Sequence, residues 1–583
     1  MIYRWMFVLL MAIPGAAAPL APESARLLTV ELFSTRSVRA LTVTPLGSGS
    51  TRRVDGQPAL QPMTAPLQVE WAHDGLWLSP ETTVKQLALS GGFRLQASGA
   101  QEILAAGKWT IAWRQDGLRV LLTLPSEDYV AAALNGETAP DEPLASLKAM
   151  AISMRTFALV NANRHGAEGF GLCDSTHCQA LRLGRARPEV ERAVRETAGE
   201  TLWFGGQRAQ VYYTQQCGGM SESARSVWPA ERANYLAEHR ADPYCLRRSS
   251  AEWHARIALD QLSGIFRAQG WQIPFPAESI RVTRRSAGGR AVLLEVTGRG
   301  ATAKLSASSF RFAVDRALGW NQMRSDWYTV SVSGGVLEIA GRGYGHGVGL
   351  CQAGAYEMAV EGHSEAEILS FYFPGSVTGI TAADHGWQKV AGIGWTLLTT
   401  DPRAGLLVDG NAAWVKAQSL LPSPAGSTGP MVQELPNTEL FRQTTNEPGW
   451  LLASTRGNAV FLQPAAVRQN NGGAETLLLH EFLHVLVEQE AGEKAPLWLR
   501  EGLVEILASP AEATRATMDL TASEVDAALA HPASAAASRR AHLAAARMTA
   551  VLCAHYGMPA MRGFLRNGVP SGVAETLGPV AQP

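Results

Sequence analysis

The sequence lacks a dominant charge. Its 51 Lys and Arg residues are balanced by 52 Asp and Glu residues, which gives a formal net charge of −1 at pH 7. A chain that binds nucleic acid or an anionic membrane surface through its overall charge would be strongly basic, so neither partner is expected. With 583 residues, 46% of them hydrophobic, the chain is long enough for two or more hydrophobic cores.

Long apolar runs are also scarce. Residues 1–18, MIYRWMFVLLMAIPGAAA, combine an early arginine, an apolar run and small residues at the end. This pattern is typical of a secretory signal peptide and is too short to span a bilayer comfortably; a retained N-terminal anchor is the alternative. No later uncharged apolar stretch reaches about 18 residues. We therefore expect an exported protein, periplasmic or associated with the cell wall, without a transmembrane span in the mature chain.

Cysteine is sparse as well. The six cysteines are compatible with an oxidising compartment without requiring one, and they stand at positions 173, 178, 217, 245, 351 and 553. Cys173, His177 and Cys178 lie close together in the sequence, with His165 upstream. Thiolates and imidazoles at such spacing can bind zinc tetrahedrally. A disulfide or free buried thiols explain the same cysteines equally well.

Periodicity predicts an α+β fold. From residue 27 to about 124, short alternating apolar runs are separated by turns, and Gln115-Asp116-Gly117 marks a hairpin. Residues 246–340 combine a helical pattern with a second hairpin that turns at Gly288-Gly289. The front of the chain is therefore expected to be rich in β-strands.

One stretch, residues 121–179, places a carboxylate between two regular elements. Strand-like alternation is followed by Asn135-Gly136, which we interpret as a turn, and by Glu137. A helix then presents apolar residues at steps of three and four, namely Leu144, Leu147, Ala151, Met154 and Ala158. Rigid elements on both sides fix a carboxylate well enough for general acid–base catalysis. A solvated loop residue is the plain alternative.

A second segment, GRGYGHGVG at 341–349, is too rich in glycine for the interior of a regular element. It predicts a backbone that approaches a ligand closely and exposes Arg342, Tyr344 and His346. The P-loop ending is absent, and no dinucleotide-binding fingerprint is completed. A purely structural glycine turn is the alternative.

Several blocks resemble the SpoIID/LytB (stage II sporulation protein D) family over about residues 120–376. They are LNGE, LKAMAISMRTFAL, LCDSTHCQ, VYYTQQCGGMSESARSVW, NYLAEHRADPYC and GRGYGHGVGLCQAGAYEMAVEGHSEAEILSFYFPGS. The resemblance implies a lytic transglycosylase that cuts the MurNAc–GlcNAc glycan strands of peptidoglycan, with Glu137 as the catalytic acid. It also implies a substrate cleft, to which we assign Arg155, Arg342, Tyr344, His346 and Gln352.

The same resemblance bears on metal, disulfide and partner. It allows zinc in some members, for which His165, Cys173, His177 and Cys178 are the candidate ligands here. Cys217 and Cys245 flank family-like segments and are predicted to form a bridge. LytB-type relatives imply a second possibility, a domain that binds glycan without cutting it and enhances a separate cell-wall amidase.

A further motif lies near the end of the chain. In TLLLHEFLHVLVEQEAGEKAPLWLREGLVEILA (476–508), a spacing of four puts His480 and His484 on one helical face, where they can bind zinc. Glu481 can then take a proton from zinc-bound water, and Glu501 on a second helix can complete the ligand set. Two histidines on a packed helix are the alternative. The region resembles gluzincin metallopeptidases of the MA-like type, which implies a peptide or protein substrate.

These patterns give a domain plan. We expect a signal peptide at 1–18, a SpoIID-like domain at 25–380, a linker at 381–430 containing a Pro- and Gly-rich interval, and a smaller, mainly helical zincin-like domain at 431–583. Within the last, Thr521 and Glu524 form a capping box that predicts a helix start.

Overall fold

A computed structural model describes residues 26–574 except 56–58, 79–81, 230–235, 237–238, 249–250, 275, 425–426, 428, 469–472, 493, 512–519, 531 and 533. The predicted signal peptide lies outside the described residues. The chain divides into two compact units. One extends to Thr201 and includes Met358–Glu365, and the other comprises Leu202–Glu357 and the residues from Ala366 onward. Among the described helices, none has both the length and the apolar composition needed to cross a membrane.

The first unit is built on a sheet in which the described strands run in the order β11-β1-β10-β9-β8-β2-β5-β6-β7, with β3 pairing with β8 and β4. All pairs are antiparallel except β1 with β11. The strands are β1 Leu27–Leu32, β2 Ala40–Pro45, β3 Thr51–Val54, β4 Gln61–Pro62, β5 Leu67–Ala72, β6 Gly75–Leu78, β7 Thr82–Val84, β8 Gln86–Ala97, β9 Ile103–Arg114, β10 Gly117–Pro125 and β11 Leu172–Cys173.

The hairpin predicted at Gln115-Asp116-Gly117 is confirmed. Strands β9 and β10 pair with Gly117 opposite Arg114. Along β10 the apolar residues at alternate positions are buried, which are Leu118, Val120, Leu122 and Leu124. Their period of two is the pattern of a strand with one face on the core, so the sequence signal and the packing agree.

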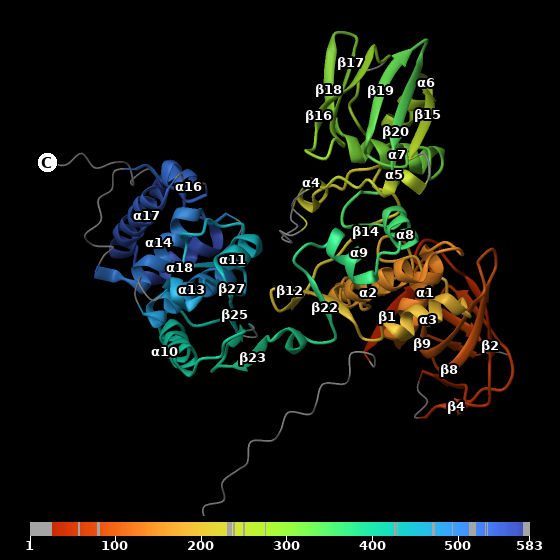
Figure 1. Ribbon diagram of the computed structural model, residues 1–583, viewed down its shortest axis with the longest axis horizontal. Helices are drawn as coiled ribbons and strands as arrows, with labels where there is room; N and C mark the ends of the chain where they lie inside the picture. The colour runs from red at the N-terminus through yellow and green to blue at the C-terminus, as the bar shows by residue number, and fades with distance from the viewer. Residues whose placement is uncertain are drawn as a thin grey trace, which may run out of the picture. The chain divides into compact units, whose positions relative to one another are not determined.

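Helices of the first unit gather beside the β1 and β10 part of the sheet (Figure 1). They are α1 Ser126–Glu137, α2 Leu144–Val160 and α3 Pro188–Glu196, with a short 3₁₀ turn at Gly166–Glu168. The predicted helix from Leu144 is confirmed, but it is not amphipathic. From Ser146 to Leu159 every residue except Lys148 is buried, because α1, α3 and the flanking segments surround α2.

The second unit begins with short elements: β12 Thr201–Phe204, β13 Gln207–Arg208, β14 Tyr213–Thr214, α4 Ala224–Val227 and α5 Cys245–Arg248. Two three-stranded sheets follow, in the orders β15-β20-β19 and β16-β17-β18. They comprise β15 Glu252–Ala258, β16 Ser279–Arg285, β17 Ala291–Gly298, β18 Ala301–Ser306, β19 Tyr328–Ser333 and β20 Val336–Arg342, with α6 Leu259–Ala268 and α7 Ala307–Leu318. Phe266, Phe310 and Tyr328 lie in their shared core. The hairpin predicted at Gly288-Gly289 is formed by β16 and β17.

After the glycine-dense segment come β21 Leu350–Cys351, α8 Gln352–Val360, α9 Glu365–Tyr372, β22 Val377–Gly379 and a 3₁₀ turn at Ala382–His385. The rear part contains a five-stranded sheet, β23-β24-β25-β27-β26, formed by Gln388–Ala391, Thr396–Thr399, Met431–Glu434, Ala459–Leu462 and Ala453–Arg456 in that order. Its inner pairs are parallel, and β23 and β26 run antiparallel at the edges.

The helices of the rear part are α10 Ala404–Leu420, α11 Thr438–Thr445, α12 Ala465–Arg468, α13 Ala474–Glu490, α14 Leu497–Ala508, α16 Ala522–Ala530, α17 Ala535–Tyr556, α18 Met558–Asn567 and α19 Ser571–Ala574 (Figure 1, teal to blue). The expected linker at 381–430 is wrong. That segment supplies β23, β24 and α10, and its Trp395 and Trp414 pack against Phe482 in one core. The described residues of the Pro- and Gly-rich interval after α10, which are 421–424, 427 and 429–430, lie outside helices and strands.

Candidate functional site

Glu137 lies at the C-terminal end of a helix. The strand β10 leads directly into α1, and Asn135 and Gly136 belong to the last turn of that helix, so the predicted strand-to-helix turn is wrong. Glu137 is the final helical residue, and Thr138 follows in an extended conformation. The buried face of α1, with Tyr129, Val130 and Leu134, anchors the helix. The carboxylate is therefore positioned by a packed helix and not by a mobile turn.

A loop covers the end of this helix and bonds to the carboxylate. The backbone N–H of Ala180 donates to Glu137 Oε1 at 2.5 Å, and the N–H of Arg182 donates to the carbonyl of Ala132 at 3.0 Å. A Cβ at Gly136 would lie 2.2 Å from the carbonyl oxygen of Ala180. Glycine at this position therefore permits the close approach that fixes Glu137, which is half-buried.

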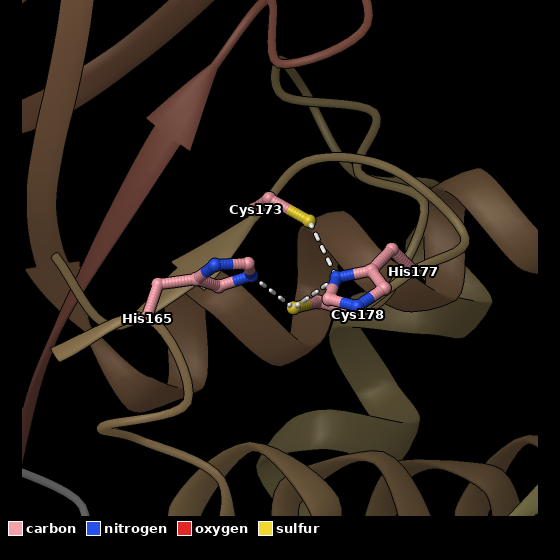
Figure 2. A group of neighbouring side chains, drawn as sticks. All are labelled: His165, Cys173, His177 and Cys178. Carbon is pink, nitrogen blue, oxygen red and sulfur yellow. Dashed lines mark hydrogen bonds between the residues drawn. The ribbon is translucent and has the colours of Figure 1, made fainter. Parts of the chain in front are cut away.

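The same loop carries a cluster of two cysteines and two histidines (Figure 2). Cys173 Sγ lies 3.7 Å from His177 Nδ1, and Cys178 Sγ lies 3.5 Å from His165 Nε2 and 3.9 Å from His177 Nδ1. With zinc–sulfur distances of about 2.3 Å and zinc–nitrogen distances of about 2.0 Å, tetrahedral ligand atoms lie about 3.5–3.8 Å apart. The four residues named from the sequence are thus brought together at a separation that suits zinc.

Neighbouring groups favour the protonation states in which these side chains can bind a cation. Glu168 Oε1 lies 2.7 Å from His165 Nδ1, so the carboxylate can hold that nitrogen protonated and direct Nε2 toward the thiols. A hydrogen bond from Cys178 lowers the pKa of Cys173 to about 3 despite its burial. Tyr129 is buried, which raises the pKa of its hydroxyl, and the charges of Cys178 and Glu137 raise it further. The carboxylate and the cluster therefore share one electrostatic environment.

Arg155, which we assigned to the substrate cleft, forms a buried ion pair inside the first unit. It is fully buried in α2, where Nε and Nη2 donate to the two carboxylate oxygens of Glu127 at 2.9 and 2.6 Å. Its Nη1 donates to the carbonyl of Glu200 at 3.0 Å. All three guanidinium nitrogens are thus used inside the protein, and Arg155 joins α2 to the start of α1.

The glycine-dense segment also differs from expectation. Gly343, Gly345, Gly347 and Gly349 all have positive φ, between +73° and +101°. The backbone they bring close is the protein's own, because added Cβ atoms at Gly345 and Gly349 would lie 2.4 Å from Thr214 Oγ1 and 2.0 Å from the carbonyl oxygen of Tyr212. The segment packs on the chain around β14, which pairs in parallel with β21. This backbone packing is sufficient to require glycine at these positions.

Arg342, Tyr344 and Gln352, which we assigned to the substrate cleft, each lie in a different environment. Arg342 is exposed and stacks over Trp327, with its Cζ 3.4 Å from the ring centroid. Tyr344 is half-buried, and its hydroxyl donates to Asn321 Oδ1. Gln352 begins α8 and is half-buried.

His346 is held by the backbone. Its Nδ1 accepts from the N–H of Val348 at 3.0 Å, and the ring packs against Trp228 with centroids 4.9 Å apart. Burial, and then the positive charges of Arg290 and Arg311, lower the pKa of His346 to about 3. The imidazole is therefore neutral near pH 7, so it supplies no positive charge to an anionic substrate.

The predicted ligands of the rear motif also lie together. His480 and His484 are on α13 with their Nε2 atoms 3.0 Å apart, and Glu501 Oε2 on α14 is 3.5 Å from His484 Nε2. Burial and the neighbouring His484 lower the pKa of His480 to about 3, which leaves its ring neutral. Neutral imidazoles and a carboxylate are the forms that bind zinc. Zinc at His480, His484 and Glu501 stays a prediction, for which these residues supply ligand types that the ion accepts.

The sequence analysis did not predict two residues of this site, His542 and Thr455. His542 on α17 lies with Nε2 3.4 Å from Glu501 Oε2 and with Nδ1 2.8 Å from the carbonyl of Ser538. Thr455 on the edge strand β26 donates to Glu481 Oε2 at 2.6 Å. Burial raises the pKa of Glu481. Neither His542 nor Thr455 belongs to a recognisable motif, so only the packing of α17 and β26 reveals them.

The cysteines of the second unit are not bridged as predicted. All six cysteines of the chain are free thiols, and the pair Cys217 and Cys245 lies in one group with Cys351 and Asp242. A third thiol at the same place removes the reason to prefer that pair.

Comparison with known proteins identifies the front of the chain. A family model described as stage II sporulation protein (SpoIID) matches residues 114–204. An uncharacterized protein of Brachyspira hyodysenteriae is 31% identical over 267 residues, which are 45% of this chain and 68% of that relative. The chain contains a SpoIID family domain at residues 114–204.

Two Bacillus subtilis proteins extend the SpoIID comparison. Stage II sporulation protein D is 25% identical over 308 residues, covering 49% of this chain and 83% of that relative. The amidase enhancer is 24% identical over 274 residues, which are 40% of this chain and 38% of the enhancer. The SpoIID model includes Glu137 and the whole Cys/His cluster, whereas the rear motif lies outside it.

Proposed function

We propose that this protein is an exported peptidoglycan-remodelling enzyme whose first unit cleaves MurNAc–GlcNAc strands as a lytic transglycosylase. The observation that carries the proposal is the fixed position of Glu137, between a packed helix and the loop bonded to its carboxylate. The match of the SpoIID model to residues 114–204 and the sporulation relatives support a cell-wall substrate. The signal-like N-terminal sequence supports export.

A single carboxylate is sufficient for this reaction. Glu137 protonates the glycosidic oxygen as its bond to C1 of MurNAc breaks, and the electron pair of that bond leaves with the oxygen. The C6 hydroxyl of the same sugar then forms the new bond to C1 and gives its proton to Glu137, which yields a 1,6-anhydro product. Because the nucleophile is part of the substrate, its effective concentration is high and no second enzyme carboxylate is required.

The Cys/His cluster has a structural role in this proposal. His165, Cys173, His177 and Cys178 would hold zinc, and the ion would fix the loop that continues to Ala180. The loop in turn orients Glu137 through the Ala180 N–H. Removal of the metal is therefore expected to disturb catalysis through position, without any step of the reaction at the metal.

For the rear part we propose a zinc-dependent peptidase. His480, His484 and Glu501 would hold the ion, which when bound supplies an activated water, and Glu481 would accept its proton. Strand β26 is an edge of its sheet among the described strands, and Thr455 on it contacts Glu481. A sheet edge can pair with an extended peptide, so β26 offers a place for a peptide or protein substrate beside the catalytic residues.

The transglycosylase proposal is tested by mass spectrometry of peptidoglycan, with its stem peptides removed, after incubation with the protein. We expect anhydro-muramyl products from the wild type and none from Glu137→Gln. Glu189→Gln is the matched control, because Glu189 is an exposed carboxylate on α3. Equal profiles from the wild type and Glu137→Gln would reject Glu137 as the catalytic acid.

The alternative is a glycan-binding enhancer of a cell-wall amidase, which the amidase enhancer relative favours. Under that alternative the protein alone releases no anhydro products, but it increases product release when a purified amidase is added. Glu137→Gln would then retain the enhancement.

The peptidase proposal is tested by metal content. We expect about one zinc ion to be lost in His480→Ala and in Glu501→Ala. His555→Ala is the control, because His555 is exposed at the end of α17. Unchanged zinc in both ligand variants would reject the site.

A further inference from the structure

A third group of side chains that could hold a metal ion lies in the second unit and shares no residue with the two sites described above. Cys217 follows β14, Asp242 and Cys245 lie at the start of α5, and Cys351 lies in β21. Their sulfur and carboxylate atoms are all within 4.8 Å of one another, and each residue is at most 1% exposed. The sequence motifs assigned none of these residues to a metal.

The separations suit a tetrahedral ion. Cys217 Sγ is 3.2 Å from Asp242 Oδ2. Tetrahedral zinc with sulfur and oxygen ligands places the ligand atoms about 3.5–3.8 Å apart, so a small expansion of the group admits the ion. Three thiolates with one carboxylate form a donor set that selects zinc over the hard cations calcium and magnesium.

A backbone N–H bonds to one of the sulfur atoms, as is common around thiolate ligands of a metal. The N–H of Cys217 donates to Cys351 Sγ at 3.2 Å. Gly218 and Gly219, which follow Cys217 directly, both have positive φ, +76° and +94°. Such outer hydrogen bonds stabilise negative sulfur and orient it.

The carboxylate of Asp242 has hydrogen-bond partners, and a buried cation lies near the group. Asp242 Oδ1 accepts from the N–H of Cys245 at 3.0 Å, and Oδ2 accepts from the hydroxyl of Tyr372 at 3.0 Å. Zinc with three thiolates and one carboxylate would carry a net charge of −2. The buried guanidinium of Arg290 offsets part of that charge, and its Nη2 donates to the carbonyl of Cys217 at 2.8 Å.

We propose that Cys217, Asp242, Cys245 and Cys351 bind one structural zinc ion. With four protein ligands the site has no open position, so its role is to join the loop after β14, the start of α5 and the end of the glycine-dense segment. A disulfide would use two of the three thiols and leave the third buried beside a carboxylate. Zinc uses all four groups. This inference does not depend on the proposed catalytic activities.

The test uses the full chain and total zinc measured by plasma mass spectrometry. A Cys178→Ser/His480→Ala variant disables the other two candidate sites, and we expect it to retain about one zinc ion per chain. Adding Cys351→Ala should remove that ion, whereas adding Cys553→Ser should not, because Cys553 lies outside both cysteine groups. Absence of zinc from the double variant, or retention after Cys351→Ala, would overturn the proposal.

A measurement on the wild type does not depend on whether a variant folds. The protein is alkylated in denaturant with a chelator and without reductant, and its peptides are then identified by mass spectrometry. We expect Cys217, Cys245 and Cys351 all to carry the alkyl group. A disulfide-linked peptide containing any two of them would overturn the zinc site.

Discussion

Replacing Glu127 by glutamine should destabilise the first unit strongly. Arg155 is 0% exposed, and Glu127 supplies both oxygens that neutralise it. Glu127→Gln removes the carboxylate that pairs directly with the buried guanidinium. Removing one partner of a buried ion pair costs about 3–5 kcal/mol, because the remaining charge is neither solvated nor paired. By contrast, Arg192→Gln breaks an exposed ion pair with Glu196 and should cost less than about 1 kcal/mol.

Replacing both residues of the Glu127–Arg155 ion pair tests this reasoning more directly. A Glu127→Leu/Arg155→Met variant removes both charges and keeps apolar volume, so we expect it to be more stable than Glu127→Gln. Because the chain has two units, the stability of this one is best followed by hydrogen exchange of peptides from α1 and α2. A loss of 3–5 kcal/mol corresponds to at least about a hundredfold faster exchange. If Arg155→Met left exchange unchanged and abolished binding to peptidoglycan, our structural assignment of Arg155 would be wrong.

Two further outcomes follow from the geometry. Gly136→Ala places a Cβ 2.2 Å from the carbonyl oxygen of Ala180, so we expect loss of anhydro-product formation and a loss of about 1–3 kcal/mol of local stability. Gly264→Ala adds its Cβ in open space within helix α6, so it should leave product formation unchanged and raise stability by up to about 1 kcal/mol. His346 has a folded-state pKa of about 3, against an ordinary value of 6.5, so the unfolded chain takes up a proton first as the pH falls. Stability should therefore decline between pH 6.5 and pH 3, by at most a few kcal/mol, and Tm measured against pH should decline less in His346→Asn; an identical acid slope in both proteins would contradict this.

Local patterns in the sequence predicted many of the elements. The alternation before Glu137 and the polar turn at residues 115–117 gave the β9–β10 hairpin, and spacing gave α2. The capping box is confirmed, since Thr521 and Glu524 bond reciprocally before α16. The four Cys/His residues, and the three ligand candidates of the rear motif, lie together because each set is close in sequence or on neighbouring helices.

What failed depends on contacts between distant segments. Arg155 was assigned to a substrate because its partner, Glu127, lies on another helix. The glycine-dense segment was assigned to a ligand because the segment that it packs on, around Thr214, is more than a hundred residues earlier. The segment 381–430 was called a linker from its Pro- and Gly-rich end, although Trp395 and Trp414 belong to the rear core. His542 carries no motif at all.

The first unit is completed by Met358–Glu365, a piece of chain far beyond the family-matched residues. Glu365 Oε1 lies 3.7 Å from Lys148 Nζ on α2, so even the central helix has a neighbour from this late segment. During synthesis, Glu137 is made long before the last segment of its unit, Met358–Glu365. A fragment ending near residue 204 would carry Glu137 and the Cys/His cluster but would lack Met358–Glu365, so truncation experiments should retain the chain at least to Glu365.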